Sequence, residues 1–224
     1  MEPGRRFYLV FSREKRLRFL SHLDMMRLWE RALRRAGLPL RYSQGYHPHP
    51  RLSLALPLAV GMTAAAEWLE IETQFPVRPE EIEQRLPSQL PIGTTLHEVR
   101  EAPWQVPSLA AQLQGAEYEV AVRSSLSLEE VQEKVGRFLA TETWPLEEQR
   151  KGKARTSDLR KGVEELEVGE WAAGSGQLRM VLHHNAGAHA RPDALVQALG
   201  LGSRTMVHRR RLLFGSSTDS CLGN

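Results

Sequence analysis

The chain has 224 residues, of which 41% are hydrophobic and 25% charged, a composition typical of a globular protein with one or two domains. The net charge is +3, and the single cysteine, Cys221, excludes a disulfide scaffold and an iron–sulfur cluster held by several thiolates of this chain. The sequence has no run near the ~20 apolar residues of a membrane span and no glycine loop for a nucleotide, so we expect a soluble cytoplasmic protein with no cofactor and no membrane partner.

The first 101 residues predict alternating strands and helices. Residues 6–11 are rich in aromatic and branched side chains and predict a strand, which we expect to continue over residues 17–20. The elements expected next are a helix over 22–36, strands over 51–56 and 67–72, a helix that begins at Pro79 and Glu80 and ends by Pro87 or Pro91, and a strand over 94–99. The order β-α-β-β-α-β is that of a ferredoxin-like unit, with two helices on one face of an antiparallel sheet.

The helix over 22–36 has clear start and stop signals. Ser21 is a favourable N-cap, and Asp24 places negative charge at the positive end of the helix dipole. Apolar residues recur at helical spacing from Met25 to Ala36. Gly37 suits a left-handed C-terminal position, and Pro39 prevents the helix from continuing.

Four arginines lie on the polar face of this helix: Arg27, Arg31, Arg34 and Arg35. Residues 1–60 contain twelve basic and four acidic side chains, a local excess of eight positive charges. One interpretation is a solvated helix face with Glu30 paired to Arg34, and the other is a surface for phosphates. Both stay open from the sequence.

The loop YSQGYHPHPR, residues 42–51, follows this helix. Pro48 and Pro50 fix their own backbone angles and favour extended conformations before them, so the loop presents its side chains from a stiff backbone. Tyrosine rings are surfaces on which bases stack. The candidate nucleic-acid contacts of this loop are Tyr42, Tyr46, His47, His49 and Arg51.

Two other interpretations of the loop are an ordered turn with a purely structural role and a metal site. The candidate metal ligands are His22, His47 and His49. No carboxylate or cysteine lies beside them at ligand spacing, so no metal is predicted.

The second half of the chain predicts the same order of elements. Residues 102–115 contain prolines and little periodicity and predict a linker, and residues 216–224 predict a disordered tail. Within residues 116–215 the expected elements are a strand over 118–123, a helix over 127–140, a strand from Trp144 into a basic loop, strands over 163–168 and 177–183, a helix over 192–199 and a strand over 206–214. The predicted fold is therefore α+β, with two tandem ferredoxin-like units over residues 1–101 and 116–215.

The loop from Arg150 to Lys161 is the second basic segment. Its candidate nucleic-acid contacts are Arg150, Lys151, Lys153, Arg155 and Arg160. A basic hairpin can enter a groove of a structured nucleic acid, although exposed hairpins are often basic for solubility alone. Residues 209–211 are also arginines, but strand alternation prevents all three from facing one way.

Two stretches resemble a bacterial domain family usually named "radical SAM-linked". They are LRFLSHLDMMRLWERALRRAGLPLRYSQGYHPHPRLSLALPLAVG, residues 17–61, and TSDLRKGVEELEV, residues 156–168, with Asp158, Leu159 and Arg160. In many members an asparagine is expected where this chain has His47, whereas Pro48, His49 and Pro50 fit. The resemblance implies a companion to a radical SAM protein that works near RNA metabolism, and it brings no catalytic residues.

We therefore consider three functions. The first is a non-catalytic RNA-binding module that presents tRNA or ribosomal RNA to a radical SAM partner. The second is a metal-independent endoribonuclease, by analogy with the RNA-processing proteins of CRISPR systems, with His22, His49 and Arg51 as candidate catalytic residues. The third is a module that docks on a radical SAM enzyme without contacting nucleic acid.

Overall fold

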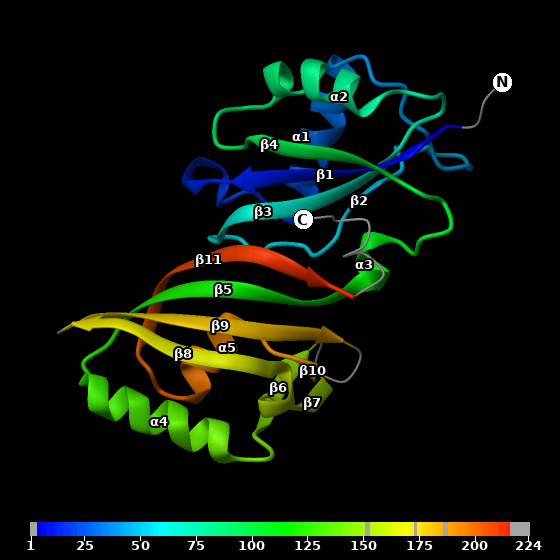
Figure 1. The fold of residues 1–224 in the computed structure, drawn as a ribbon. Helices are drawn as coiled ribbons and strands as arrows, with labels where there is room; N and C mark the ends of the chain where they lie inside the picture. The colour runs from blue at the N-terminus through cyan, green and yellow to red at the C-terminus, as the bar shows by residue number, and fades with distance from the viewer. Residues whose placement is uncertain (1–3, 151–152, 173, 186–187, 216–224) are drawn as a thin grey trace. The chain divides into compact units, whose positions relative to one another are not determined.

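The structure, a computed structural model, describes residues 4–150, 153–172, 174–185 and 188–215 (Figure 1). The chain divides into two compact units: unit 1 comprises Met1–Leu113 and Phe214–Asn224, and unit 2 comprises Gln114–Leu213. Each unit combines antiparallel strand pairs with helices, so the predicted α+β class is confirmed. The predicted tail, residues 216–224, lies outside the described residues.

Unit 1 contains a four-stranded sheet. Its elements are β1 (Arg6–Arg13), the short 3₁₀ helix η1 (Lys15–Leu17), α1 (His22–Arg35), β2 (Leu52–Leu54), β3 (Thr63–Glu72), α2 (Pro79–Arg85), the 3₁₀ helix η2 (Pro87–Gln89), β4 (Leu96–Ala102) and α3 (Leu109–Gln112). Strand β1 pairs antiparallel with β3 and β4, and β3 pairs with β2 along its other edge. The strand order in this unit is therefore β4-β1-β3-β2.

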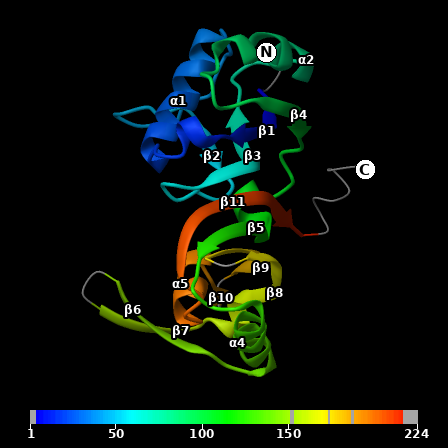
Figure 2. The ribbon, with the colours of Figure 1, turned by 90° about the vertical axis from the view of Figure 1, so that its left-hand side faces the viewer.

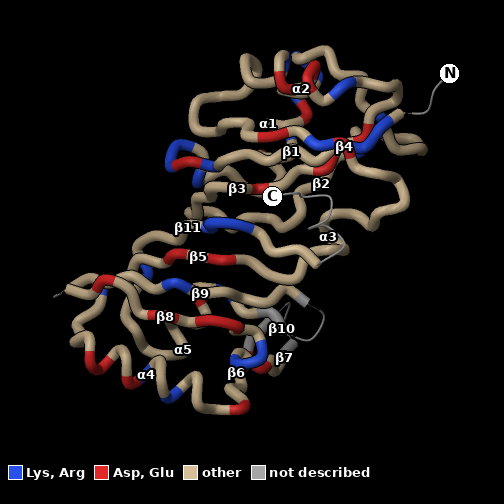
Figure 3. The backbone as a smooth tube through the Cα atoms, in the orientation of Figure 1, with Lys and Arg blue, Asp and Glu red and all other residues tan. Residues whose placement is uncertain are grey.

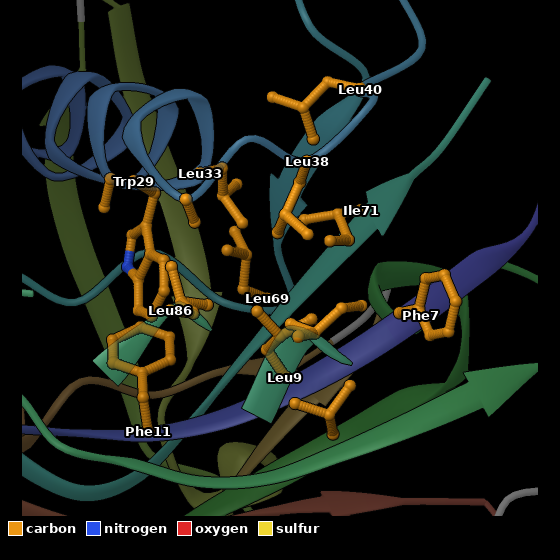
Figure 4. Close-up of a cluster of buried hydrophobic side chains, with 14 of the residues drawn as sticks. Phe7, Leu9, Phe11, Trp29, Leu33, Leu38, Leu40, Leu69, Ile71 and Leu86 are labelled. Carbon is orange, nitrogen blue, oxygen red and sulfur yellow. The ribbon is translucent and has the colours of Figure 1, made fainter. Parts of the chain in front are cut away.

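The core of unit 1 lies between one face of this sheet and helices α1 and α2. Alternate residues of β1 point to this side, and Phe11 meets Trp29 of α1 edge to face with ring centroids 4.5 Å apart (Figure 4). Leu33 of α1 and Ile82 of α2 are fully buried in the same cluster. Each such side chain contributes about 1.5–3 kcal/mol of hydrophobic stabilisation, which fixes α1 on the sheet with its polar face outward.

The predicted continuation of the first strand over residues 17–20 is wrong. The chain forms η1 and a turn there, because the buried guanidinium of Arg13 collects carbonyl oxygens from this segment. It donates to Leu17 O at 3.2 Å, Arg18 O at 2.9 Å and Leu20 O at 2.7 Å. A buried charge needs such partners, and an extended strand does not bring three carbonyls within four residues to one point.

The segment expected as a linker is partly fastened to unit 1. Helix α3 lies within it, and the backbone N–H of Leu109 donates to Glu70 Oε2 at 2.9 Å. Arg6 donates to Val106 O at 2.6 Å, and Gln112 donates to Pro107 O at 2.6 Å. Glu70 is opposite Tyr8 in the β1–β3 register, and both are buried. The segment thus covers the face of the sheet opposite α1.

Unit 2 has a sheet of four long strands, in which the short strand β10 also pairs with β9, and a separate hairpin. Its elements are β5 (Leu113–Arg123), α4 (Leu128–Ala140), β6 (Pro145–Arg150), β7 (Lys153–Asp158), the 3₁₀ helix η3 (Arg160–Gly162), β8 (Val163–Ala172), β9 (Ser175–Asn185), β10 (Ala188–His189), α5 (Pro192–Ala198) and β11 (Ser203–Phe214). Strand β9 pairs antiparallel with β5 along one edge and with β8 along the other, which gives the order β8-β9-β5-β11. The predicted basic loop is the β6–β7 hairpin, which extends away from this sheet (Figure 2).

Candidate nucleic-acid interface

Helix α1 presents the first group of candidate arginines, and its start is fixed as expected. Ser21 Oγ accepts the backbone N–H of Asp24 at 3.2 Å, and Asp24 Oδ2 accepts the Ser21 N–H at 3.3 Å, which completes a capping box. Hydrogen bonds from the side chain and backbone of Ser21 lower the pKa of Asp24, and the nearby Arg27 and Arg31 act in the same direction. The helix prediction over 22–36 is confirmed.

Three of the arginines line one open pocket with a volume of about 380 Å³. Arg27, Arg31 and Arg35 are four residues apart, so their side chains follow one another along the helix. The pocket is completed by Asp24, Leu20, Leu28 and Pro91. Three guanidinium groups against one carboxylate give the pocket lining an excess of positive charge.

The three pocket arginines differ in how the fold holds them. Arg35 is oriented by Gln89, to whose backbone oxygen it donates at 2.6 Å. Arg27 Nη1 lies 3.8 Å from Asp24 Oδ1, a loose and exposed pair. Arg31 makes no hydrogen bond or ion pair with any described residue, so it has all its donors available.

The fourth arginine of the helix, Arg34, has an internal role. Its Nε donates to the hydroxyl of Tyr42 at 3.0 Å, and its Nη2 lies 2.9 Å from Glu30 Oε1. The hydrogen bond to Tyr42 is the largest contribution that raises the pKa of Arg34. Arg34 therefore joins α1 to the loop that follows the helix, and the i,i+4 pair with Glu30 expected from the sequence is present.

The loop 42–51 is closed at its base by backbone contacts. Tyr42 and Pro50 form an isolated antiparallel bridge. Ser43 N–H donates to His49 O at 2.8 Å, and His49 N–H donates to Ser43 Oγ at 3.0 Å. Beyond this closure Tyr46 is 95% exposed, and its ring meets the edge of His47 with centroids 5.2 Å apart.

The candidate catalytic residues lie on different elements: His22 on α1, and His49 and Arg51 in the loop that follows the helix. His22 lies at the first residue of α1, beside a small cavity that Arg13 and Glu67 also line. His49 belongs to the loop whose Tyr42 is bonded to Arg34. Arg34 is twelve residues after His22 in α1, which corresponds to about 18 Å along the helix axis. Arg51 lies near the loop base, 3.8 Å from Glu72.

The candidate metal ligands His22, His47 and His49 do not meet either. Among the described residues, no cluster of three or more His, Cys, Asp or Glu side chains has the arrangement of a metal site. We therefore assign no metal ligands in this part of the chain.

For the basic hairpin, the structure describes the pairing of the two strands. Arg150 lies opposite Lys153, and Glu148 lies opposite Arg155. Lys151 lies outside the described residues, and the side chains of Arg150, Lys153 and Arg155 are not among those that the structure describes. These positions therefore remain sequence-based predictions.

Arg160 and its neighbours close the base of the hairpin. Asp158 Oδ1 accepts the backbone N–H groups of Trp144 at 2.9 Å and Arg160 at 3.0 Å, and Leu159 is buried. Arg160 donates to Val163 O at 2.8 Å and lies 5.7 Å from the ring centroid of Phe138 in α4. The fold thus gives Arg160, a candidate phosphate contact, an internal role.

Sequence reasoning missed a network of ion pairs on the exposed face of the unit 2 sheet. Glu117 of β5 accepts from Arg179 of β9 at 2.9 Å and from Arg211 of β11 at 2.8 Å, and Glu119 pairs with Arg210 at 2.5 Å. Burial raises the pKa of Glu117, but the two arginine hydrogen bonds outweigh it and the pKa is lowered. Acidic β8 and β5 thus alternate with basic β9 and β11 (Figure 3).

The signal for this network was the spacing of its residues. Glu117 and Glu119 are two apart on a strand and so share a face, which could have suggested a row of carboxylates beside Arg210 and Arg211. The spacing does not show which strands lie beside β5 in the sheet. The arginines at 210 and 211 are consequently occupied by carboxylates of their own unit.

Among the described residues, no helix combines the length and the apolar character that are needed to cross a lipid bilayer.

The chain belongs to an uncharacterised protein family conserved in bacteria (DUF2344), whose sequence pattern matches residues 6–192. No curated protein has a matching sequence. The fold is similar to a chain in the crystal structure of a Cbf5-Nop10-Gar1 complex, with TM-score 0.51, 12% identity and coverage of 91% of this chain and 48% of the other. A chain in the structure of an H/ACA RNP bound to a substrate RNA containing 2'-deoxyuridine matches with TM-score 0.50, 12% identity and coverage of 91% and 47%. This chain therefore spans about half the length of the solved chains that it matches.

Proposed function

We propose that this protein is a non-catalytic, cytoplasmic RNA-binding module, and that the pocket formed by Arg27, Arg31 and Arg35 contacts the RNA backbone. The observation that carries the proposal is the row of three guanidinium groups with a single carboxylate among them. Arg31 has no internal partner among the described residues, so the fold leaves this cation for an external anion. Guanidinium groups bind phosphate oxygens in a bidentate manner.

The length of the row favours a polyanion over a single small anion. From Arg27 to Arg35 the helix rises about 12 Å, so the three side chains reach successive positions along a chain of phosphates. The pocket is open, and its apolar rim of Leu20, Leu28 and Pro91 accommodates the less polar parts of a nucleotide. An H/ACA RNP with substrate RNA is one of the structures with a similar fold, which agrees with an RNA partner.

Within this proposal, residues 1–101 and 116–215 each form a ferredoxin-like fold. The support is the order of elements, together with the strand orders β4-β1-β3-β2 and β8-β9-β5-β11. We also propose that the RNA, tRNA or ribosomal RNA, is presented to a radical SAM protein for modification or processing. This part depends on the resemblance of residues 17–61 and 156–168 to radical SAM-linked proteins.

The first prediction concerns the double variant Arg27→Glu/Arg31→Glu. Neither side chain holds a close hydrogen bond in the fold, so the variant keeps its melting temperature while its affinity for structured RNA falls at least about tenfold. The measurement is fluorescence anisotropy with a labelled tRNA at several salt concentrations. The slope of log affinity against log salt concentration should also be shallower for the variant than for the wild type, by about 0.7–0.9 for each lost phosphate contact.

The matched control is Arg137→Glu, an exposed arginine on the outer face of α4 that pairs with Glu133. It makes the same Arg→Glu change at one position of another helix, half the charge change of the double variant, and should change the affinity less than about twofold. Equal affinity of the Arg27→Glu/Arg31→Glu variant and the wild type would refute the proposal. So would wild-type binding that does not depend on salt.

A second candidate function, docking on a protein without nucleic-acid contact, is favoured by exposed apolar side chains at the start of α1. Phe19 and Leu23 are 67% and 63% exposed, and the guanidinium of Arg18 lies 4.6 Å from the Phe19 ring centroid. Exposed apolar side chains beside cations are common at protein interfaces. Absence of RNA binding by the wild-type chain, with loss of a partner complex on Phe19→Ser/Leu23→Ser, would support this function instead.

A further inference from the structure

The loop after α1 separates its two tyrosines into different roles. We propose that Tyr46, at the exposed end of this loop, stacks on an unpaired nucleobase, so that the preferred ligand is a single-stranded or looped RNA segment. This inference rests on the proposed RNA-binding function and narrows its ligand class. It depends on three features of the loop: a fixed base, an uncovered ring and a cationic surrounding.

The base of the loop is held by contacts on both of its arms. The Tyr42–Pro50 bridge and the two hydrogen bonds between Ser43 and His49 close the loop. The next pair is joined as well, because Arg51 N–H donates to Arg41 O at 2.7 Å. The backbone that carries Tyr46 is therefore ordered before any ligand arrives, and less conformational entropy is lost on binding.

Tyr42 and Tyr46 differ sharply in their surroundings. Tyr42 is half-buried, packs against the core of unit 1 and accepts the Arg34 hydrogen bond. Tyr46 is 95% exposed, and the only ring that contacts it among the described residues is that of His47, in a T-shaped pair. A ring so uncovered contributes almost nothing to the hydrophobic stability of the fold, while its surface stays accessible to a planar ligand.

The surroundings favour a nucleobase as that planar ligand. Four arginines of α1 precede the loop, one of which holds Tyr42. Arg41 and Arg51 flank the loop and share a single carboxylate, Glu72, at 3.4 and 3.8 Å, which leaves one positive charge in excess there. A nucleic-acid strand combines flat rings with the phosphates that such cations attract. In a continuous RNA duplex, neighbouring bases already cover each base face, so a stacking tyrosine finds no free face there.

The test compares an unstructured RNA dodecamer with a perfect duplex of the same sequence, by fluorescence anisotropy. The variants are Tyr46→Ala, Tyr46→Phe and Arg27→Glu/Arg31→Glu. Tyr46→Ala should weaken binding of the single strand by about 5- to 150-fold and leave binding of the duplex within about twofold. Tyr46→Phe keeps the ring and should bind the single strand like the wild type.

A set of dodecamers with one abasic nucleotide identifies the stacked base. At one position the abasic RNA should bind the wild type as weakly as intact RNA binds Tyr46→Ala, and the variant should show no further loss there. Equal effects of Tyr46→Ala on single strand and duplex would overturn the inference, as would no effect on either.

The outcomes separate this inference from the function it rests on. If Tyr46→Ala is silent while Arg27→Glu/Arg31→Glu weakens binding, the phosphate surface stands and stacking is refuted. If neither variant changes the RNA affinity, both the phosphate surface on α1 and the stacking by Tyr46 are refuted.

Discussion

Asp158 shows how one side chain can set the geometry of a whole loop. Its carboxylate accepts the backbone N–H groups of Trp144 and Arg160, so it closes the hairpin where β7 ends. The hydrogen bond from Trp144 is the largest cause of its lowered pKa. The stretch Asp158-Leu159-Arg160 therefore has a structural explanation: an acceptor for the loop, a buried side chain and a guanidinium packed against α4.

The variant Asp158→Asn should destabilise unit 2 by about 1.5 kcal/mol at pH 7, because hydrogen bonds to a charged acceptor are replaced by weaker ones. The sign of the pH dependence follows from the lowered pKa. Ionised Asp158 stabilises the folded state above its unfolded pKa of about 3.9, and this stability is lost as the pH falls through the folded pKa. Urea unfolding between pH 7 and pH 3 should show the difference between variant and wild type shrinking at the acid end.

An unchanged gap between the two proteins down to pH 3 would show that Asp158 acts through its shape and not through its charge. The wild-type curve alone does not decide this, because Glu117 also has a lowered pKa and loses stabilising interactions in the same direction.

At the scale of elements, α1 and α4 are two helices with the same cap. Ser21 with Asp24, and Ser127 with Glu130, each form a capping box, and both boxes join residues three apart in the sequence. They form wherever the serine precedes a helix, so their geometry depends little on the rest of the fold. This is why both helices were predicted correctly in position and length.

We expect Ser21→Ala to destabilise α1 by about 1 kcal/mol, through loss of the side-chain acceptor for the Asp24 N–H. The measurement is amide hydrogen exchange, in which the first turns of α1 should exchange faster while those of α4 do not change. Ser127→Ala is the matched variant and should produce the reverse pattern. Faster exchange in both helices from either single variant would contradict independent capping.

At the scale of the whole molecule, the two units differ in how far their arginines are paired with carboxylates. In unit 1, the pocket of α1 contains three arginines against Asp24. In unit 2, Arg179, Arg210 and Arg211 are neutralised by carboxylates on neighbouring strands. The net charge of +3 is therefore a poor guide to where an anion binds, because pairing removes most of the field of the unit 2 sheet.

The variant Arg210→Ala/Arg211→Ala should accordingly change RNA affinity less than about twofold, although it removes two positive charges. It should still lower the stability of unit 2 at neutral pH, because Glu117 and Glu119 lose partners. Anisotropy with the same labelled tRNA checks the first expectation and urea unfolding the second. A tenfold loss of affinity would place the unit 2 sheet in the RNA interface.

Sequence reasoning recovered most strands and helices, and it failed where a single long-range contact decided the local structure. Residues 17–20 have a strand-like composition, but the guanidinium of Arg13 draws their carbonyls into a turn. Residues 102–115 have linker-like composition, but hydrogen bonds with Glu70 and Arg6 fix part of this segment on the sheet. In the candidate site, the sequence placed all four helix arginines on one surface, and the fold uses Arg34 to hold Tyr42 instead.

By itself the sequence determined the α+β class, the caps and the amphipathic helix that carries the arginines. Caps and helix faces depend on residues three or four apart, and strands show as local alternation of side chains. Only the tertiary structure decided which cations are left for a ligand. The Glu117–Arg211 pair joins residues 94 apart, and the Leu109–Glu70 bond joins residues 39 apart. Local patterns contain no information about such partners, and the free energy of a charge depends on the partner it meets.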